Sequence, residues 1–91
     1  MAGATTKAEN PTQERSIWFV ELSRAPSVEG ESRASLDAEH AAFRANAKMR
    51  NVVLRTRYEY STLFNGLAVS ATDDEIAELQ TIDGVKAVER A

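Results

Sequence analysis

The sequence predicts a small α+β domain whose elements follow in the order strand, helix, strand, strand, helix, strand. Three observations support this order. Four short runs are rich in β-branched, aromatic or aliphatic residues, which is typical of strands. An amphipathic segment separates the first run from the second. Another segment, opened by a helix-capping motif, separates the third run from the fourth.

The composition limits the chain to one small domain and excludes several classes of site. A chain of 91 residues builds only one modest hydrophobic core. The sequence contains no cysteine, which excludes disulfides, thiolate metal sites and cysteine nucleophiles. The formal net charge of -3 argues against nucleic acid, because proteins that bind it concentrate Lys and Arg on one face. We therefore expect no nucleic-acid partner and no cofactor.

The N-terminal residues 1–15 are predicted to form a disordered leader or linker, and the folded domain is predicted to cover residues 16–91. The leader is small and polar, contains Pro11 and shows no apolar periodicity. No apolar run approaches the ~18 to 20 residues that span a bilayer, so we expect no membrane partner. The N-terminus also lacks the apolar segment of a signal peptide, so the signal of an exported protein would lie upstream.

The first strand is predicted over residues 16–22, where apolar side chains occupy both faces. We expect one face to be covered by helices and to carry Trp18, Val20 and Leu22. The opposite face then carries Ile17 and Phe19.

The first helix is predicted to follow a loop at residues 23–31, which contains a proline and a glycine. Ser32 or Ser35 can cap the helix, which is expected to run to about Met49. Four residues at positions i, i+4, i+7 and i+11 form one apolar stripe: Leu36, His40, Phe43 and Ala47.

Residues 52–60 and 67–70 are predicted to form two strands joined by a turn. Asn65-Gly66 is interpreted as turn and strand-edge geometry, because glycine tolerates close approaches that other residues resist. Tyr58 and Tyr60 share one strand face and are expected to pack against the first helix. In the second strand of the pair, the residues expected to face the helices are Leu67 and Val69, and those expected on the opposite face are Gly66, Ala68 and Ser70.

The second helix is predicted to begin at a capping box in which Thr72 and Glu75 satisfy each other's backbone amides. Gly84 lies where the helix is expected to terminate, and residues 85–89 form the last strand. Val85 and Val88 can both face inward only if this strand has a bulge or an early start. The helical residues expected to face the core are Ile76, Leu79 and Ile82.

This order of elements is that of the ferredoxin-like fold, a four-stranded antiparallel sheet with two helices on one face. Right-handed crossovers place the first and third strands in the centre. Two helices cannot cover both faces of the sheet, so a flat and partly apolar patch is expected to stay exposed. We infer a protein partner for this patch and expect a monomer when the domain is free.

The chain resembles the propeptides of subtilisin-like serine proteases, a family that also contains stand-alone subtilisin inhibitors. The resemblance covers about residues 17–89. It is carried by four segments, Trp18-Phe19-Val20, His40-x-x-Phe43, Tyr58 to Val69 and Gly84-Val85-x-x-Val88-Glu89. It implies a domain that is not an enzyme but an intramolecular chaperone and an inhibitor of its own protease, secreted as part of an exported precursor.

The resemblance also implies how such a domain meets its protease. The open sheet face around Phe19, Ala68 and Ala87 would dock on two parallel surface helices of the catalytic domain. Glu89 would cap the N-termini of those helices, and the tail formed by Arg90 and Ala91 would lie in the substrate cleft. Only two residues follow Glu89, which extend ~7 Å, so Ala91 is not expected to fill the primary specificity pocket. Replacing Ala68 with Arg is expected to abolish docking with little loss of fold.

Two readings compete with this one. Within the family, the chain could be an excised propeptide or a free-standing inhibitor. From another class, it could be a small-molecule regulatory domain of the same fold, which ligand-induced thermal stabilisation would reveal. An RNA-recognition domain is disfavoured, because it would need basic and aromatic residues on its third strand.

Two clusters of polar residues are explained more simply by helix packing and helix capping than by a catalytic or metal site. His40 lies three residues after Asp37 on an amphipathic helix, which indicates a packed, semi-buried histidine rather than half of a catalytic pair. Asp73, Asp74 and Glu75 follow a helix start, which explains all three without a metal ion.

Overall fold

A computed structural model of the chain describes residues 14–91, so the predicted leader lies outside the described residues except for its last two positions. One of these, Arg15, is tied to the domain. Its guanidinium donates hydrogen bonds to the Ser70 carbonyl (2.8 Å) and to the Glu75 carboxylate (2.9 Å). Arg15, which the sequence assigns to the leader, therefore contacts the folded domain.

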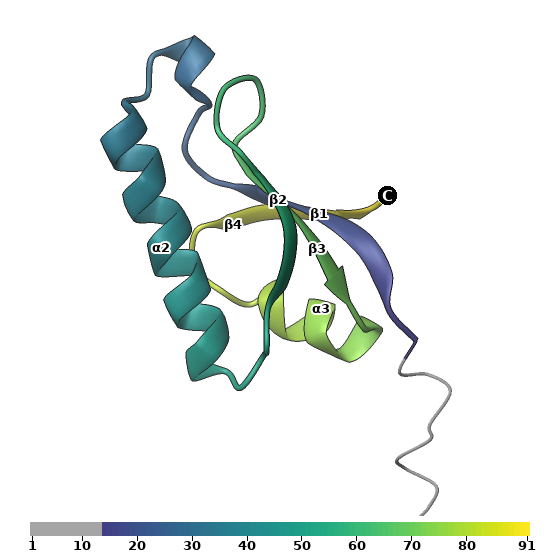
Figure 1. Cartoon of the computed structure of the whole chain (residues 1–91). Coiled ribbons are helices and arrows are strands. Elements are labelled where there is room, and N and C mark those ends of the chain that lie inside the picture. Colours follow the sequence, from purple (N-terminus) through teal and green to yellow (C-terminus); the bar gives the residue numbers. More distant parts are fainter. Residues whose placement is uncertain (1–13) are drawn as a thin grey trace, which may run out of the picture.

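The four strands form one antiparallel sheet in the order β2-β3-β1-β4, with α2 to the left of the sheet and α3 below it in Figure 1. The strands are β1 (Ser16–Leu22), β2 (Arg55–Tyr60), β3 (Gly66–Ala71) and β4 (Val85–Arg90). The α-helices are α2 (Arg33–Met49) and α3 (Asp73–Leu79), and a short 3₁₀ turn precedes α2 at Ser27–Glu29. This is the predicted ferredoxin-like βαββαβ fold, with β1 and β3 in the centre.

Helix α2 is capped by Ser32, whose hydroxyl accepts a hydrogen bond from the Ser35 amide at 3.1 Å. The buried residues of the helix are the four of the predicted stripe. The helix ends at a turn in which the Val52 amide donates to the Ala47 carbonyl at 3.0 Å and Asn51 has a φ of 62°. Because this turn uses residues 50–52, β2 starts at Arg55, later than the sequence run indicates.

Helix α3 begins at the predicted capping box. The Thr72 hydroxyl accepts from the Glu75 amide at 3.2 Å, and the Glu75 carboxylate accepts from the Thr72 amide at 3.0 Å. Ile76 and Leu79 are buried, and so is Ile82 in the turn that follows the helix. The same carboxylate oxygen of Glu75 also accepts the bond from Arg15, so the start of α3 is joined to the start of β1.

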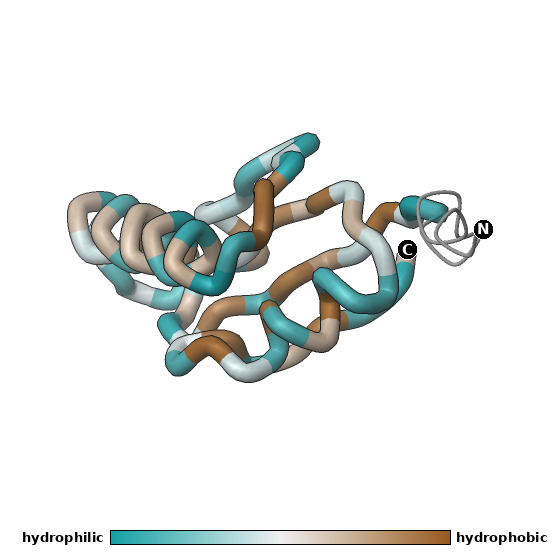
Figure 2. The backbone as a smooth tube through the Cα atoms, turned by 90° about the horizontal axis from the view of Figure 1, so that it is seen from below, coloured by the Kyte–Doolittle hydropathy of each residue, from teal (hydrophilic) through white to brown (hydrophobic). Residues whose placement is uncertain are grey.

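The core lies between the sheet and the two helices. Val20 and Leu22 of β1 and Leu67 and Val69 of β3 are almost fully buried in the same cluster as residues of α2 and α3. Figure 2 shows the most hydrophobic residues concentrated in the strands, whereas α2 carries polar positions at regular intervals. The predicted assignment of these strand residues to the helix-covered face is confirmed.

Strand β4 contains the irregularity that its sequence requires. Its pairing with β1 shifts register between Glu21 and Leu22, and both Val85 and Val88 pack against the core. A bulge adds one residue to one strand and so changes which side chains share a face. The expectation that two valines three positions apart need a bulge is therefore confirmed.

Candidate docking face of the sheet

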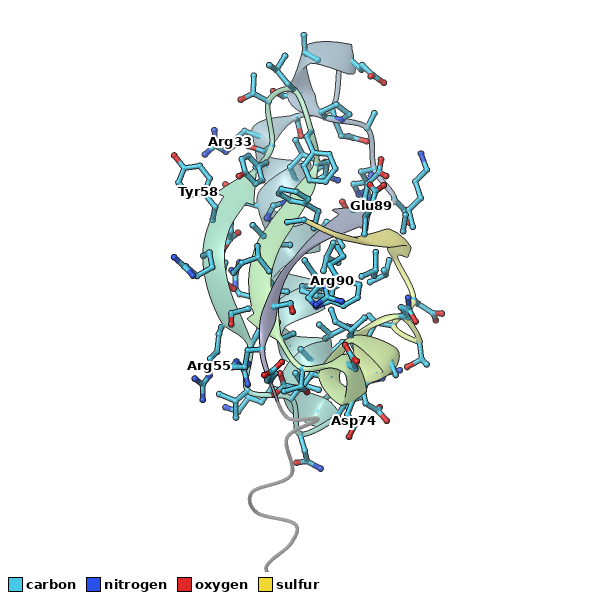
Figure 3. The ribbon with its side chains drawn as sticks, turned by 90° about the vertical axis from the view of Figure 1, so that its right-hand side faces the viewer. Arg33, Arg55, Tyr58, Asp74, Glu89 and Arg90 are labelled. Atoms are coloured by element: carbon cyan, nitrogen blue, oxygen red, sulfur yellow. The ribbon has the colours of Figure 1, made fainter. Side chains whose placement is uncertain are left out.

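The register of the sheet sets four side chains in one row on the face turned away from the helices. Tyr58 of β2 lies opposite Ala68 of β3, which lies opposite Phe19 of β1, which in turn lies opposite Glu89 of β4. Directly opposed residues of antiparallel strands project from the same face. Figure 3 shows the two ends of this row, Tyr58 and Glu89, at opposite edges of the sheet.

Four aromatic rings cluster on this face: Phe19, Tyr58, Tyr60 and Phe64, which we call the aromatic cluster. The ring of Tyr60 is central, with its centroid 5.0 Å from Tyr58, 5.8 Å from Phe64 and 6.5 Å from Phe19. All of these pairs are tilted or edge-to-face, the arrangements that aromatic quadrupoles favour. Three of the rings and Glu89 line a hollow of about 370 Å³.

The expectation that Tyr58 and Tyr60 pack against the first helix is wrong. Glu59, which lies between them, points to the helix side, where its carboxylate contacts Arg44 (2.9 Å) and His40 (2.8 Å). Successive side chains of a strand alternate between faces, so both tyrosines must point the opposite way. The alternation of Glu59 with the two tyrosines could have indicated which face each side chain occupies. The sequence did not show, however, that the partners of Glu59 lie on α2.

The face is also less flat than the small residues of β3 indicated. Ala68 is only 5% exposed, whereas Phe19 in the neighbouring strand is 37% exposed. Ala68 lies opposite both Phe19 and Tyr58, so large side chains surround it. An Arg at this position would displace those rings, and the expectation that Ala68→Arg spares the fold is therefore corrected.

Gly66 allows Phe64 to lie against the sheet. A Cβ atom on Gly66 would overlap the Val20 carbonyl oxygen and would lie 2.8 Å from the Phe64 ring. Only glycine fits between a neighbouring backbone and this ring, which confirms the interpretation of Asn65-Gly66 as close-approach geometry.

Two other predicted docking residues lie on β4 and are exposed. Ala87 pairs with Glu21, whose carboxylate is 3.7 Å from the Lys86 ammonium group. Glu89 borders the hollow, and none of the ion pairs within residues 14–91 involves it. An exposed carboxylate at the rim of an apolar hollow remains available to a partner.

The predicted tail residues, in contrast, are held to β1. Arg90 is the last residue of β4 and lies opposite Trp18, with its guanidinium carbon 5.6 Å from the centre of the indole ring. It also donates a hydrogen bond to the Ser16 hydroxyl at 2.8 Å. The Ala91 amide donates to the Ile17 carbonyl at 2.9 Å. Reaching a protease cleft would require these two residues to leave the sheet.

The described part of the chain contains no group of three or more His, Asp or Glu side chains arranged to hold a metal ion. No helix within it is both long and apolar enough to cross a membrane.

A small ferredoxin-like domain that leaves an aromatic sheet face uncovered has the features of a protein-binding domain. Comparison with known protein families identifies the kind of protein-binding domain. The model of the peptidase inhibitor I9 family matches residues 20–90, and the chain belongs to this family, that of the subtilisin propeptides. These domains are inhibitors of subtilisin-family peptidases and not catalytic domains. Neither the curated proteins nor the solved structures gave a significant match.

Proposed function

We propose that this inhibitor propeptide docks on a subtilisin-like serine protease through the aromatic cluster and Glu89, inhibits that protease and assists its folding. The observation that carries the proposal is the aromatic cluster itself, an apolar surface on the sheet face that neither helix covers. Exposed apolar patches of this kind are typical of protein interfaces, where buried aromatic residues supply much of the binding energy.

The hollow and Glu89 support docking on helices of the catalytic domain. In this arrangement, surface helices of the protease lie against Phe19 and Ala87, and the Glu89 carboxylate meets the free amides at their N-termini. A carboxylate at a helix N-terminus contributes ~0.3 to 2 kcal/mol through charge-assisted hydrogen bonds and the helix dipole. Ala68 adds little contact area of its own but keeps the neighbouring rings close to the strand.

Inhibition would follow when the chain beyond Glu89 occupies the substrate cleft. Arg90 and Ala91 make one cation–π contact and two hydrogen bonds with β1, and these bonds must break before the tail can extend. Docking of the sheet face keeps the released tail near the cleft and so raises its effective concentration.

The chaperone role follows from the same surface. A domain that binds the native arrangement of protease helices lowers the free energy of states in which those helices are already formed. We place the domain in the exported precursor of a secreted protease, where folding and inhibition are both required before the protease is released.

The test is to titrate the domain into a subtilisin-family protease while following cleavage of a small peptide substrate, with an unrelated serine protease as control. Selective loss of activity is expected. If activity persists, binding is measured directly by calorimetry with the same protease. The absence of both binding and inhibition would overturn the proposal and favour a ligand-binding module that uses the hollow, which thermal stabilisation by small molecules would reveal.

A further inference from the structure

The segment from residue 44 to residue 57 is strongly basic within an acidic chain. It contains five Lys or Arg residues and no Asp or Glu, whereas the whole chain has a formal net charge of -3. The segment covers the C-terminal part of α2, the turn that follows it and the start of β2, which lie together in the lower part of the molecule in Figure 1. Its basic residues are Arg44, Lys48, Arg50, Arg55 and Arg57.

Most of these cations are not neutralised by carboxylates of the described residues. Arg44 is neutralised, because its guanidinium lies within 3.0 Å of both carboxylate oxygens of Glu59. None of the ion pairs within residues 14–91 involves Lys48, Arg55 or Arg57, and all three side chains are exposed. Figure 3 shows Arg55 on the outer side of β2. Exposed cations without carboxylate neighbours attract the anionic groups of a partner.

Strand β2 also has an unpaired edge. It is the outermost strand in the order β2-β3-β1-β4, so one row of its backbone N–H and C=O groups has no partner strand among residues 14–91. Five of its six residues are exposed. An edge of this kind is a template to which an extended chain can add as a further strand.

The charges and the bulge of β2 select what can pair with this edge. Arg57 is the extra residue of the bulge, because the pairing with β3 shifts register between Thr56 and Tyr58. Arginines and a bulge on an edge strand oppose pairing with basic strands and with the same edge of a second copy. An acidic strand instead gains ion pairs with Arg55 and Arg57. The edge therefore favours an acidic partner over others.

A second hollow lies beside the start of β2, apart from the one on the docking face. Its volume is about 420 Å³, and it is lined by Arg44, Lys48 and residues 51–54. Two large apolar side chains in the same part of the chain are mostly exposed, Met49 at 79% and Val53 at 71%. The second hollow therefore suits an apolar side chain that is flanked by acidic ones.

We propose that the edge of β2 is a second binding site, which takes an extended acidic segment of a partner protein as a fifth strand. The backbone of the segment pairs with β2, its carboxylates meet Lys48, Arg55 and Arg57, and one of its apolar side chains enters the second hollow. The inference goes beyond the proposed function and does not rest on it, because the site uses the edge of the sheet and not the face around Phe19.

Other occupants would use only part of this site. An anionic membrane or a nucleic acid would meet the charges but leave the backbone groups of β2 unpaired. A second copy of the chain carries neighbouring acidic residues at Asp73, Asp74 and Glu75, but these lie in helix α3 and cannot add a strand. An extended acidic polypeptide uses the charges, the backbone edge and the second hollow together.

The first test uses a labelled ten-residue peptide in which Glu and Val alternate, titrated into the domain while fluorescence anisotropy is followed. The same peptide with Lys in place of Glu is the control. Only the acidic peptide is expected to bind, and the amide NMR signals that shift are expected to come from β2 and residues 48–54. The absence of binding, equal binding of both peptides or shifts confined to other elements would overturn the proposal.

Strand addition is separated from simple charge attraction by N-methylation of the acidic peptide. One version carries N-methyl groups on every Glu and the other on every Val, so in each version alternate backbone N–H groups are removed. Alternate residues of an edge strand turn their N–H groups toward the neighbouring strand. One version is therefore expected to bind as the parent peptide does and the other to lose binding. Unchanged binding of both versions would contradict a fifth strand.

The charge of the edge is tested with Arg57→Glu, and Arg33→Glu is the matched control. Arg33 is exposed on α2, so the control makes the same change of net charge far from β2. Arg57→Glu is expected to weaken binding of the acidic peptide by at least about tenfold, because attraction becomes repulsion. The control is expected to bind within about twofold of the parent. Urea denaturation checks that both variants are folded, and equal affinity of Arg57→Glu and the parent would overturn the proposal.

The competing occupants are tested with the same two variants. The domain is expected to remain monomeric in sedimentation and to stay in solution with vesicles of equal parts phosphatidylcholine and phosphatidylserine. A dimer that Arg57→Glu abolishes would assign the edge to a second copy. Vesicle binding that Arg57→Glu abolishes, without peptide binding, would assign the charges to a membrane surface. Either result would overturn the proposal.

Discussion

At the scale of single residues, Ala87 offers the sharpest test of the docking face. It is exposed on β4 beside Glu21 and does not belong to the core cluster, so a large side chain there is expected to leave the fold intact. Ala87→Arg is expected to weaken inhibition of the protease by at least tenfold, because it places bulk and charge where the partner must approach.

The matched control for this substitution is Ala42→Arg, which adds the same side chain at an exposed position of α2. The control is expected to inhibit as the parent does, and both variants should unfold at the parent's urea concentration. Equal inhibition by Ala87→Arg and the parent would place the interface elsewhere on the domain.

Gly66 is the residue where a single methyl group is expected to cost most. A Cβ at this position would overlap the Val20 carbonyl oxygen, which cannot move aside without disturbing the pairing of β1 and β3. Gly66→Ala is expected to lower the free energy of unfolding by about 1 to 3 kcal/mol, the usual cost of overpacking.

Gly84→Ala separates this steric effect from backbone strain. Gly84 has a φ of 97° but open space around its Cβ position, so only the strain of a left-handed conformation applies, about 1 to 2 kcal/mol. Urea denaturation of both variants is the measurement. A smaller loss for Gly66→Ala than for Gly84→Ala would contradict the close approach.

At the scale of elements, the start of α3 is expected to depend on its capping box. This helix has only 7 residues, and its first turn is satisfied by Thr72 and Glu75. Thr72→Ala is expected to lower the free energy of unfolding by about 0.5 to 2 kcal/mol, because a buried helix end loses its acceptor.

Ser32→Ala is the control for this cap, since Ser32 caps the longer helix α2 at an exposed site. Its loss is expected to be the smaller of the two in urea denaturation. If Thr72→Ala left stability unchanged, the Arg15 contact to Glu75 and tertiary packing would be sufficient to hold α3.

The elements themselves were largely predictable, because their signals are local. The stripe of α2, the capping box of α3 and the two valines of β4 each depend on spacing within one segment. The end of α2 was less predictable: Val52 continues a β-branched run in the sequence, but its amide completes the turn that ends the helix.

At the scale of the whole molecule, the proposed chaperone role predicts an effect on a separate chain. A protease whose catalytic serine has been replaced, and which lacks its propeptide, is expected to refold faster when this domain is added. Fluorescence or circular dichroism measures the refolding, so inhibition does not interfere.

Ala87→Arg provides the control for refolding, as it does for inhibition. If the parent and this variant accelerated refolding equally, the docking face would not be responsible. No acceleration by either would leave inhibition as the only function of the domain.

The sequence was sufficient to predict the order of elements, the fold and the uncovered sheet face, because periodicity, capping motifs and connection rules act over short distances. It was not sufficient to predict the aromatic cluster or the contacts of His40. Which face Tyr58 and Tyr60 occupy depends on how the bulged β2 pairs with β3, and the partners of His40, Glu59 and Asn65, lie 19 and 25 residues away along the chain. Contacts between distant segments are set by the register of the sheet and the packing of α2, and only the tertiary structure decides these.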